Sequence, residues 1–328
     1  MTESPDLSPE RVAAASASLQ AVETQMNRAV LGQRQVIREL IQAMAAAGHV
    51  LIEGLPGLGK TLMVRALARA IGGRYSRIQF TPDLMPSDIT GHAIFDMKTE
   101  QFHIRRGPVF CNLLLGDEIN RAPAKTQAAM LEAMQERQVT IEGKPLALES
   151  PFLVMATQNP IEQEGTYPLP QSQLDRFLIK ASIGYPADDD EMALVRQVTD
   201  GAIGDGLDLS RVAPVIEPAK LLEIQAIAAA LIIDDSVLDY AVRMVRASRD
   251  WQGIESGAGP RASVALVRTA RARALLGGNG FVTPSDVKSV AHAVLRHRIK
   301  LSADLEIEGY RSDDVLAELL DSVPAPRS

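Results

Sequence analysis

The sequence predicts an α/β fold: a parallel sheet wrapped by helices, followed by a smaller all-helical domain. Between residues 30 and 183, short apolar runs alternate with helical stretches, which is typical of a parallel sheet covered by helices. From residue 218 onward the pattern is helical throughout. The length of 328 residues also suits about two domains of ordinary size.

Five short apolar runs are the expected strands of the sheet. They are Val50–Ile52, Arg77–Phe80, Leu113–Leu115, Phe152–Ala156 and Phe177–Lys180. Two inserts interrupt the alternation, and each is expected to form a hairpin around a polar turn, with plain loop as the alternative. The first pairs Ala93–Met97 with Phe102–Arg105, and the second pairs Val139–Glu142 with Leu146–Leu148.

The chain is expected to divide into four parts. Residues 1–30 hold a tail and an accessory helix, 31–184 the α/β domain, 185–217 a linker, and 218–328 the helical domain. In the linker, the aspartates at 188–190 signal a helix N-cap, and the glycine-rich residues 200–206 indicate a flexible connection. The helices expected in the last domain are Ala219–Ala230, Val237–Arg249, Arg261–Leu276 and Pro284–Arg298. Its arginines at 268, 271 and 273 and the segment 295–298 are expected to form a solvated face, with a subunit contact as the alternative.

Composition excludes several classes of protein. A single cysteine, Cys111, cannot close a disulfide within the chain, which favours a reducing compartment. No secretory signal is visible, and the longest apolar run, Ala226–Ile233, is far below the ~18 residues that span a bilayer. We therefore expect a cytoplasmic protein without membrane insertion. The net charge of −7 and the low aromatic content disfavour a nucleic-acid binder, although a local basic channel is compatible with them.

Residues 54–61, GLPGLGKT, match the phosphate-binding loop pattern GxxxxGK[ST]. Glycines let the backbone curl so that N–H groups point at phosphate oxygens, and the next helix adds the positive end of its dipole. Lys60 is expected to neutralise the β and γ phosphates, and Thr61 to ligate magnesium. The expected nucleotide-binding residues are Gly54, Pro56, Gly57, Leu58, Gly59, Lys60, Thr61, Leu62 and Asp117.

Polar residues follow two later strands. Asp117 is expected to hold the metal, directly or through water, and Glu118 to polarise the attacking water. Such a pair by itself is commonly a helix cap, but behind a phosphate loop it indicates hydrolysis. Asn159 follows the strand that ends near Ala156 and could orient the water, with turn chemistry before Pro160 as the alternative.

Together these motifs resemble those of AAA+ ATPases, specifically the MoxR branch. The matching stretches are Glu53–Thr61, 117–123 continuing through 134–136, 156–160, 174–177 and 259–263, within a resemblance that runs from about Leu31 to Arg298. The resemblance implies an AAA+ αβα core with strand order 5-1-4-3-2 and a C-terminal helical lid. It also implies a ring, usually hexameric, that binds ATP and Mg²⁺ between neighbouring subunits.

The resemblance also implies residue roles that spacing alone does not. Asn159 matches sensor 1, and Arg176 matches the arginine finger that reaches the γ phosphate in the adjacent subunit, with a surface salt bridge as the alternative. Arg261 matches sensor 2, a lid arginine that contacts the nucleotide, with a surface charge as the alternative. Gly116 departs from the pattern, because an apolar residue is commoner there, and no pore loop of the threading type is evident.

The leading hypothesis is a Mg²⁺-dependent ATPase that acts as a ring-forming, chaperone-like remodeller. By resemblance, it would promote maturation or metal and cofactor insertion in client complexes, with a partner that contains a von Willebrand factor A domain. The alternative is an AAA+ nucleic-acid motor, which the acidic balance and the few basic residues of the hairpins oppose. A module with a structural nucleotide fits the acidic pair poorly, and a GTPase lacks its Asn-Lys-x-Asp segment.

Overall fold

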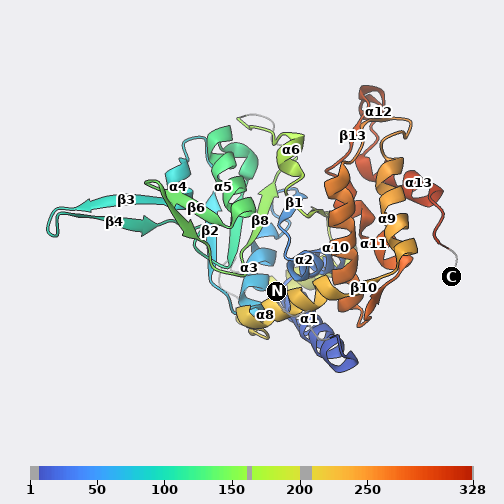
Figure 1. Ribbon diagram of the computed structural model, residues 1–328, viewed down its shortest axis with the longest axis horizontal. Helices are drawn as coiled ribbons and strands as arrows, with labels where there is room; N and C mark the ends of the chain where they lie inside the picture. Colours follow the sequence, from blue (N-terminus) through green and yellow to red (C-terminus); the bar gives the residue numbers. More distant parts are fainter. Residues whose placement is uncertain (1–6, 161–164, 200–208, 327–328) are drawn as a thin grey trace.

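The computed structural model describes residues 7–160, 165–199 and 209–326, and its core is a five-stranded parallel sheet (Figure 1). The strands are β1 Val50–Gly54, β2 Tyr75–Gln79, β5 Leu113–Asp117, β8 Leu153–Gln158 and β9 Ile179–Ile183. They lie in the order β2-β5-β8-β1-β9, with every neighbouring pair parallel. Counted along the chain as core strands one to five, this is the order 5-1-4-3-2, so the predicted topology is confirmed. The predicted flexible connection at 200–206 lies outside the described residues.

Alternating side chains of the central strands β1, β5 and β8 enter two different hydrophobic cores. In β1, Val50 and Ile52 pack into the core that also contains the helices α2 Arg34–Ala45 and α3 Lys60–Ala70. Leu51 points to the other core, which contains α5 Ala124–Glu136. Because successive strand residues face opposite sides, a continuous apolar run is what a sheet covered on both faces requires. Within the described residues, three short helices lie in the connections of the sheet domain: α4 Pro86–Thr90, the 3₁₀ turn Ile119–Arg121 and α6 Gln171–Leu174.

Both predicted hairpins are present. The first pairs β3 Gly91–Asp96 with β4 Gln101–Arg106 and projects from the sheet domain on the side away from the helical domain (Figure 1). The second pairs β6 Gln138–Ile141 with β7 Lys144–Ala147. The first hairpin carries large apolar side chains into solvent, since Met97 is 86% exposed and Phe102 is 73% exposed.

The helical domain contains the four predicted helices and two more. They are α8 Pro218–Ala230, α9 Asp235–Ala247, α10 Pro260–Leu276, α11 Pro284–Leu295, α12 Ala303–Ile307 and α13 Ser312–Ser322. Short strand pairs join them, β10 Ile232–Ile233 with β12 Phe281–Val282 and β11 Ile254–Ser256 with β13 Lys300–Leu301. Thr283 caps α11 as its sequence indicates, accepting a hydrogen bond from the Asp286 N–H at 3.2 Å. None of the described helices combines the length and apolar character needed to cross a membrane.

The accessory helix α1, Pro9–Ala29, joins the two halves of the molecule. Its buried face packs against α2 and α3 of the sheet domain and against α10 of the helical domain. Ser16 donates a hydrogen bond of 3.1 Å to the carbonyl of Leu276 at the end of α10. A further helix, α7 Asp188–Thr199, begins at the aspartate cluster, as predicted.

The side chains around position 116 explain why glycine occupies it. A Cβ atom at this position would lie 3.1 Å from Phe80 Cε2 and 3.2 Å from Met130 Sδ, so the space above the strand is already filled. Overpacking of this kind costs about 1–3 kcal/mol. We therefore expect Gly116→Leu to lower the free energy of unfolding by that amount, measured by urea denaturation. Gly116→Leu with Met130→Ala should recover part of the loss; equal stability of Gly116→Leu and the parent would contradict this account.

Candidate nucleotide-binding and hydrolysis site

The phosphate loop connects the carboxyl end of β1 to the first turn of α3 (Figure 1). Gly57 and Gly59 adopt positive φ angles of 83° and 80°, which glycine accepts without steric cost. The Lys60 ammonium donates a hydrogen bond of 2.6 Å to the carbonyl of Gly54, which folds the side chain back over the loop. The result is a curled backbone in front of a helix N-terminus, an arrangement suited to phosphate groups.

Asp117 lies at the carboxyl end of β5, and three side chains from different elements hold its carboxylate. The hydroxyl of Thr61 donates to Oδ2 at 3.3 Å, and the hydroxyl of Thr157 donates to Oδ1 at 2.5 Å. The guanidinium of Arg77 on β2 donates to Oδ2 at 2.7 Å. A hydroxyl and a carboxylate this close form a hard oxygen donor set, which fits Mg²⁺.

Glu118 is fixed in a backbone conformation that few residues other than glycine adopt. Its φ is 57°, and its N–H donates to the Thr157 hydroxyl at 2.9 Å. Its carboxylate accepts a hydrogen bond of 2.8 Å from the Gln79 amide and lies 3.3 Å from Arg121 Nε. Backbone strain of this kind concentrates at functional sites. The Gln79 amide on β2 and the Arg121 guanidinium thus set the orientation of the carboxylate.

Asn159 directly follows β8, the strand between β1 and β5 in the sheet. Its side chain is buried, with 5% of its surface exposed. Since the carboxyl ends of parallel strands meet at one edge, Asn159 lies between the phosphate loop and the acidic pair. The predicted loop, acids and amide are thus brought together.

An apolar cavity of about 270 Å³ lies beside the phosphate loop. Three segments form it: the turn after α1, the loop with the start of α3, and the region of α7. Gly32 keeps two of these segments in contact, because at its φ of 73° a Cβ would lie 2.7 Å from Pro186 Cβ. The lining includes Val30, Leu31, Leu58, Leu62, Pro186 and Leu194. Its size and position fit a planar base attached to phosphates in the loop.

Arg176 and Arg261 line one cavity of about 340 Å³, at the amino ends of β1 and β9. Five arginines and one aspartate line it: Arg137, Arg176, Arg261, Arg268, Arg298 and Asp175. This excess of cations suits an anion. The Arg176 Nε atom is buried and has no hydrogen-bond partner within the described residues. Leaving such a donor unpaired is costly, so an acceptor that enters the cavity would stabilise this side chain.

The cavity lined by the five arginines, here called the arginine cavity, lies at the amino ends of the strands. The phosphate loop lies at their carboxyl ends. The cavity includes His49, just before β1, whereas the loop begins at Gly54. Five residues of extended strand span roughly 16 Å. Neither Arg176 nor Arg261 is therefore placed at the loop of its own chain.

Arg298 anchors the segment that carries Arg176. It is 5% exposed and donates to Asp175 Oδ1 at 2.8 Å, to the carbonyl of Leu178 at 3.0 Å and to that of Phe177 at 2.6 Å. The expectation that 295–298 form a solvated helix face is therefore wrong. The helix α11 ends at Leu295, and the turn after it folds Arg298 inward. Asp175 also lies 3.9 Å from Arg261, so one carboxylate faces both Arg298 and Arg261.

The buried ring of His49 predicts a loss of stability in acid. Burial lowers the pKa of His49 to about 4, with Arg137 and Arg268 acting in the same direction and a hydrogen bond to the Met134 carbonyl opposing it. The unfolded chain binds the proton more readily, so stability is full above the unfolded pKa of 6.5 and falls as the pH drops toward 4.

Between pH 7 and pH 5 we expect a loss of about 2 kcal/mol from this residue. His49→Gln, whose amide can still accept from the Val154 N–H and donate to Met134, should flatten the decline of the thermal midpoint. If the thermal midpoint of His49→Gln falls with pH as steeply as that of the parent, other residues cause the acid sensitivity.

The fold and the position of the loop define an ATPase of the AAA+ class. Residues 49–179 match the family described as "ATPase family associated with various cellular activities (AAA)", and residues 246–319 match an AAA lid domain. A crystal structure of a candidate ATPase from Cytophaga hutchinsonii is 38% identical, with a TM-score of 0.88 over 97% of this chain and 98% of that chain.

Similar proteins show to which family within the AAA+ class the chain belongs. The chain is 41% identical to Chaperone MoxR1 of Mycobacterium tuberculosis, over 99% of this chain and 87% of that protein. It is 31% identical to Protein MoxR of Methylorubrum extorquens, over 93% and 94% of the two chains. It is also 42% identical to the uncharacterized YeaC of Bacillus subtilis, over 92% of each. The chain belongs to the MoxR family of AAA+ ATPases.

Proposed function

We propose that this protein hydrolyses ATP at a site shared by two adjacent copies in a ring. The phosphate loop with Lys60 binds the triphosphate, the apolar cavity beside it takes the adenine, and Glu118 activates the water that Asn159 orients. The observation that carries the proposal is the separation of the arginine cavity from the loop of its own chain. Head-to-tail packing would bring Arg176 and Arg261 of one copy to the nucleotide of the next.

The oxygen donors at the edge of β5 also fit a magnesium ion that arrives with the nucleotide. Thr61 and Asp117 would hold it, and the ion would neutralise charge on the phosphates. Because Arg77 already donates to Asp117 Oδ2, the aspartate keeps its orientation through β2. Thr157 secures the other carboxylate oxygen.

The proposed work of the ring is to remodel client proteins, in keeping with the relative named as a chaperone. The β3–β4 hairpin supports a protein client over nucleic acid, because Met97 and Phe102 are exposed at its free end. Assistance in client maturation or metal and cofactor insertion, a von Willebrand factor A-domain partner and a cytoplasmic location stay predictions.

The test of the shared site is the particle mass with and without ATP and magnesium. The parent should form a ring, expected to be a hexamer, when both are present. Lys60→Ala, which lacks the ammonium at the loop, should respond less or not at all. A parent that hydrolyses ATP while it remains a monomer at every concentration would overturn the proposal.

A further inference from the structure

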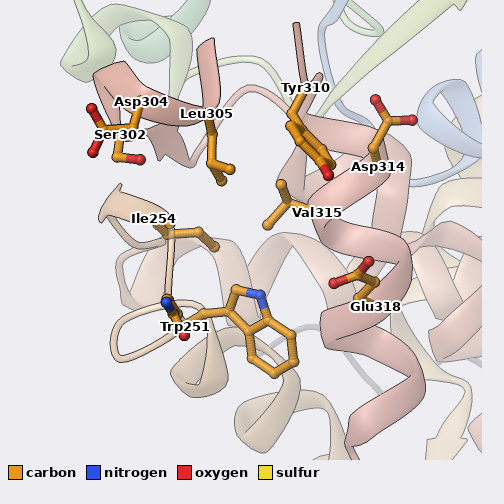
Figure 2. A pocket seen from close by; sticks show the side chains of 11 residues that line it. Trp251, Ile254, Ser302, Asp304, Leu305, Tyr310, Asp314, Val315 and Glu318 are labelled. Atoms are coloured by element: carbon orange, nitrogen blue, oxygen red, sulfur yellow. The ribbon is translucent and has the colours of Figure 1, made fainter. Parts of the chain in front are cut away.

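A third cavity, of about 590 Å³, lies wholly within the helical domain (Figure 2). Three segments line it: residues 251–254 after α9, residues 302–305 at α12, and residues 310–318 leading into α13. No residue of the phosphate loop, the acidic pair or the arginine cavity takes part. Its volume is in the range of pockets that bind a ligand the size of a few amino-acid residues.

The walls combine aromatic, aliphatic and acidic side chains. The indole of Trp251 lies along one side, with the Tyr310 ring across from it, Val315 between the two rings and Leu305 on the Tyr310 side (Figure 2). The Glu318 carboxylate points toward the space over the indole, whereas Asp304 and Asp314 stand at the rim (Figure 2). Among the residues that the structure describes, no basic side chain lines the cavity.

The charge around the cavity is negative, and two of the nearby carboxylates, Asp313 and Asp321, are paired with Arg296 at 3.0 Å and with Lys288 at 2.7 Å. Residues 300–321 contain seven carboxylates and only two basic residues, Lys300 and Arg311. Both are already paired, Lys300 with Glu255 at 2.7 Å and Arg311 with Asp314 at 3.4 Å. Among the described residues, neither Asp304 nor Glu318 lies within 4.0 Å of a cationic group. An unpaired carboxylate beside an aromatic face attracts a cation from solution.

We propose that this cavity binds an arginine or lysine side chain on an exposed segment of a partner protein. The aliphatic stem would contact Leu305 and Val315, while the charged group would meet Glu318 and the aromatic faces of Trp251 and Tyr310. The cavity is larger than one side chain needs, so residues flanking the cation also fit. The inference stands apart from the ATPase site, because it uses none of its residues.

Trp251 is the single tryptophan of the chain, so intrinsic fluorescence reports directly on this cavity. The probe is the tripeptide acetyl-Gly-Arg-Gly-amide, titrated into the full-length protein, with the neutral citrulline tripeptide as its counterpart. We expect a saturable change with the arginine peptide only, weakened by added salt. Glu318→Gln should raise the dissociation constant roughly tenfold, as loss of a charged hydrogen bond does.

The matched control is Glu308→Gln, which removes a nearby exposed carboxylate that does not line the cavity. It should bind like the parent, and ATP hydrolysis should be unchanged in Glu318→Gln, so failure here would leave the ATPase proposal intact. Equal responses to arginine and citrulline peptides, or equal weakening in both glutamine variants, would overturn the inference. Binding of free arginine as tight as that of the peptide would also overturn it, in favour of a small cationic ligand. A fluorescence change on dilution without peptide would assign the cavity to a second copy of this chain.

Discussion

Glu118→Gln should bind ATP as the parent does and lose hydrolysis by a factor of about 10²–10⁴, the usual contribution of a general base. The amide keeps the size of the side chain and its contact with Gln79, but it cannot accept a proton from the attacking water. Because the phosphate loop is untouched, binding should survive. The measurements are phosphate release under saturating ATP and equilibrium binding of a fluorescent ATP analogue.

Two further variants serve as controls for this prediction. Glu132→Gln changes an exposed carboxylate on α5, remote from the loop in sequence, and should hydrolyse ATP at the parental rate. Lys60→Ala should lose binding as well as turnover, which separates the two functions. Normal hydrolysis by Glu118→Gln would remove Glu118 from its proposed role. The binding-competent Glu118→Gln ring is also suited to capturing clients for identification.

Arg176→Ala should lower the turnover number by about 10³ or more, the effect typical of removing an arginine finger. Its decisive test is complementation with Lys60→Ala, since each variant alone should be nearly inactive. In a mixed ring, an Arg176→Ala copy still binds ATP and receives the intact arginine of a Lys60→Ala neighbour. Roughly a quarter of the sites in a random equimolar ring would then be complete.

The measurement is phosphate release as a function of the mixing ratio, with a maximum expected near equal amounts. Arg246→Ala, which removes an exposed arginine from α9, is the matched control and should leave turnover at the parental level. If the mixtures never exceed the sum of their separate activities, Arg176 does not act across a subunit boundary. Loss of nucleotide binding in Arg176→Ala itself would point instead to damage within its own chain.

Local patterns were sufficient to predict the sheet, both hairpins and the phosphate loop. Each depends on residues close together in the chain, such as the apolar run Val50–Ile52 in front of GLPGLGKT. The strand order needed the family resemblance, because periodicity does not specify which strands become neighbours. The arginine roles likewise came from resemblance.

Contacts between distant segments could not be predicted. Gln79 and Thr157 reach Glu118 only because β2, β5 and β8 are adjacent, and as single polar residues they give no sequence signal. Arg298 looked like part of a solvated basic segment, since nothing local reveals that backbone carbonyls of residues 177 and 178 surround it. The apolar cavity near the loop was missed for the same reason, because its ordinary aliphatic residues come from three separate segments.

The accessory helix α1 contacts both α3, which starts at the phosphate loop, and α10, whose first turn contains Arg261. A displacement of α3 on nucleotide exchange would therefore strain the packing that positions α10. In a head-to-tail ring, the nucleotide occupancy of one copy would then bias the position of the arginines that it offers to the next copy. Hydrolysis in one copy would thereby be coupled to the active site of its neighbour.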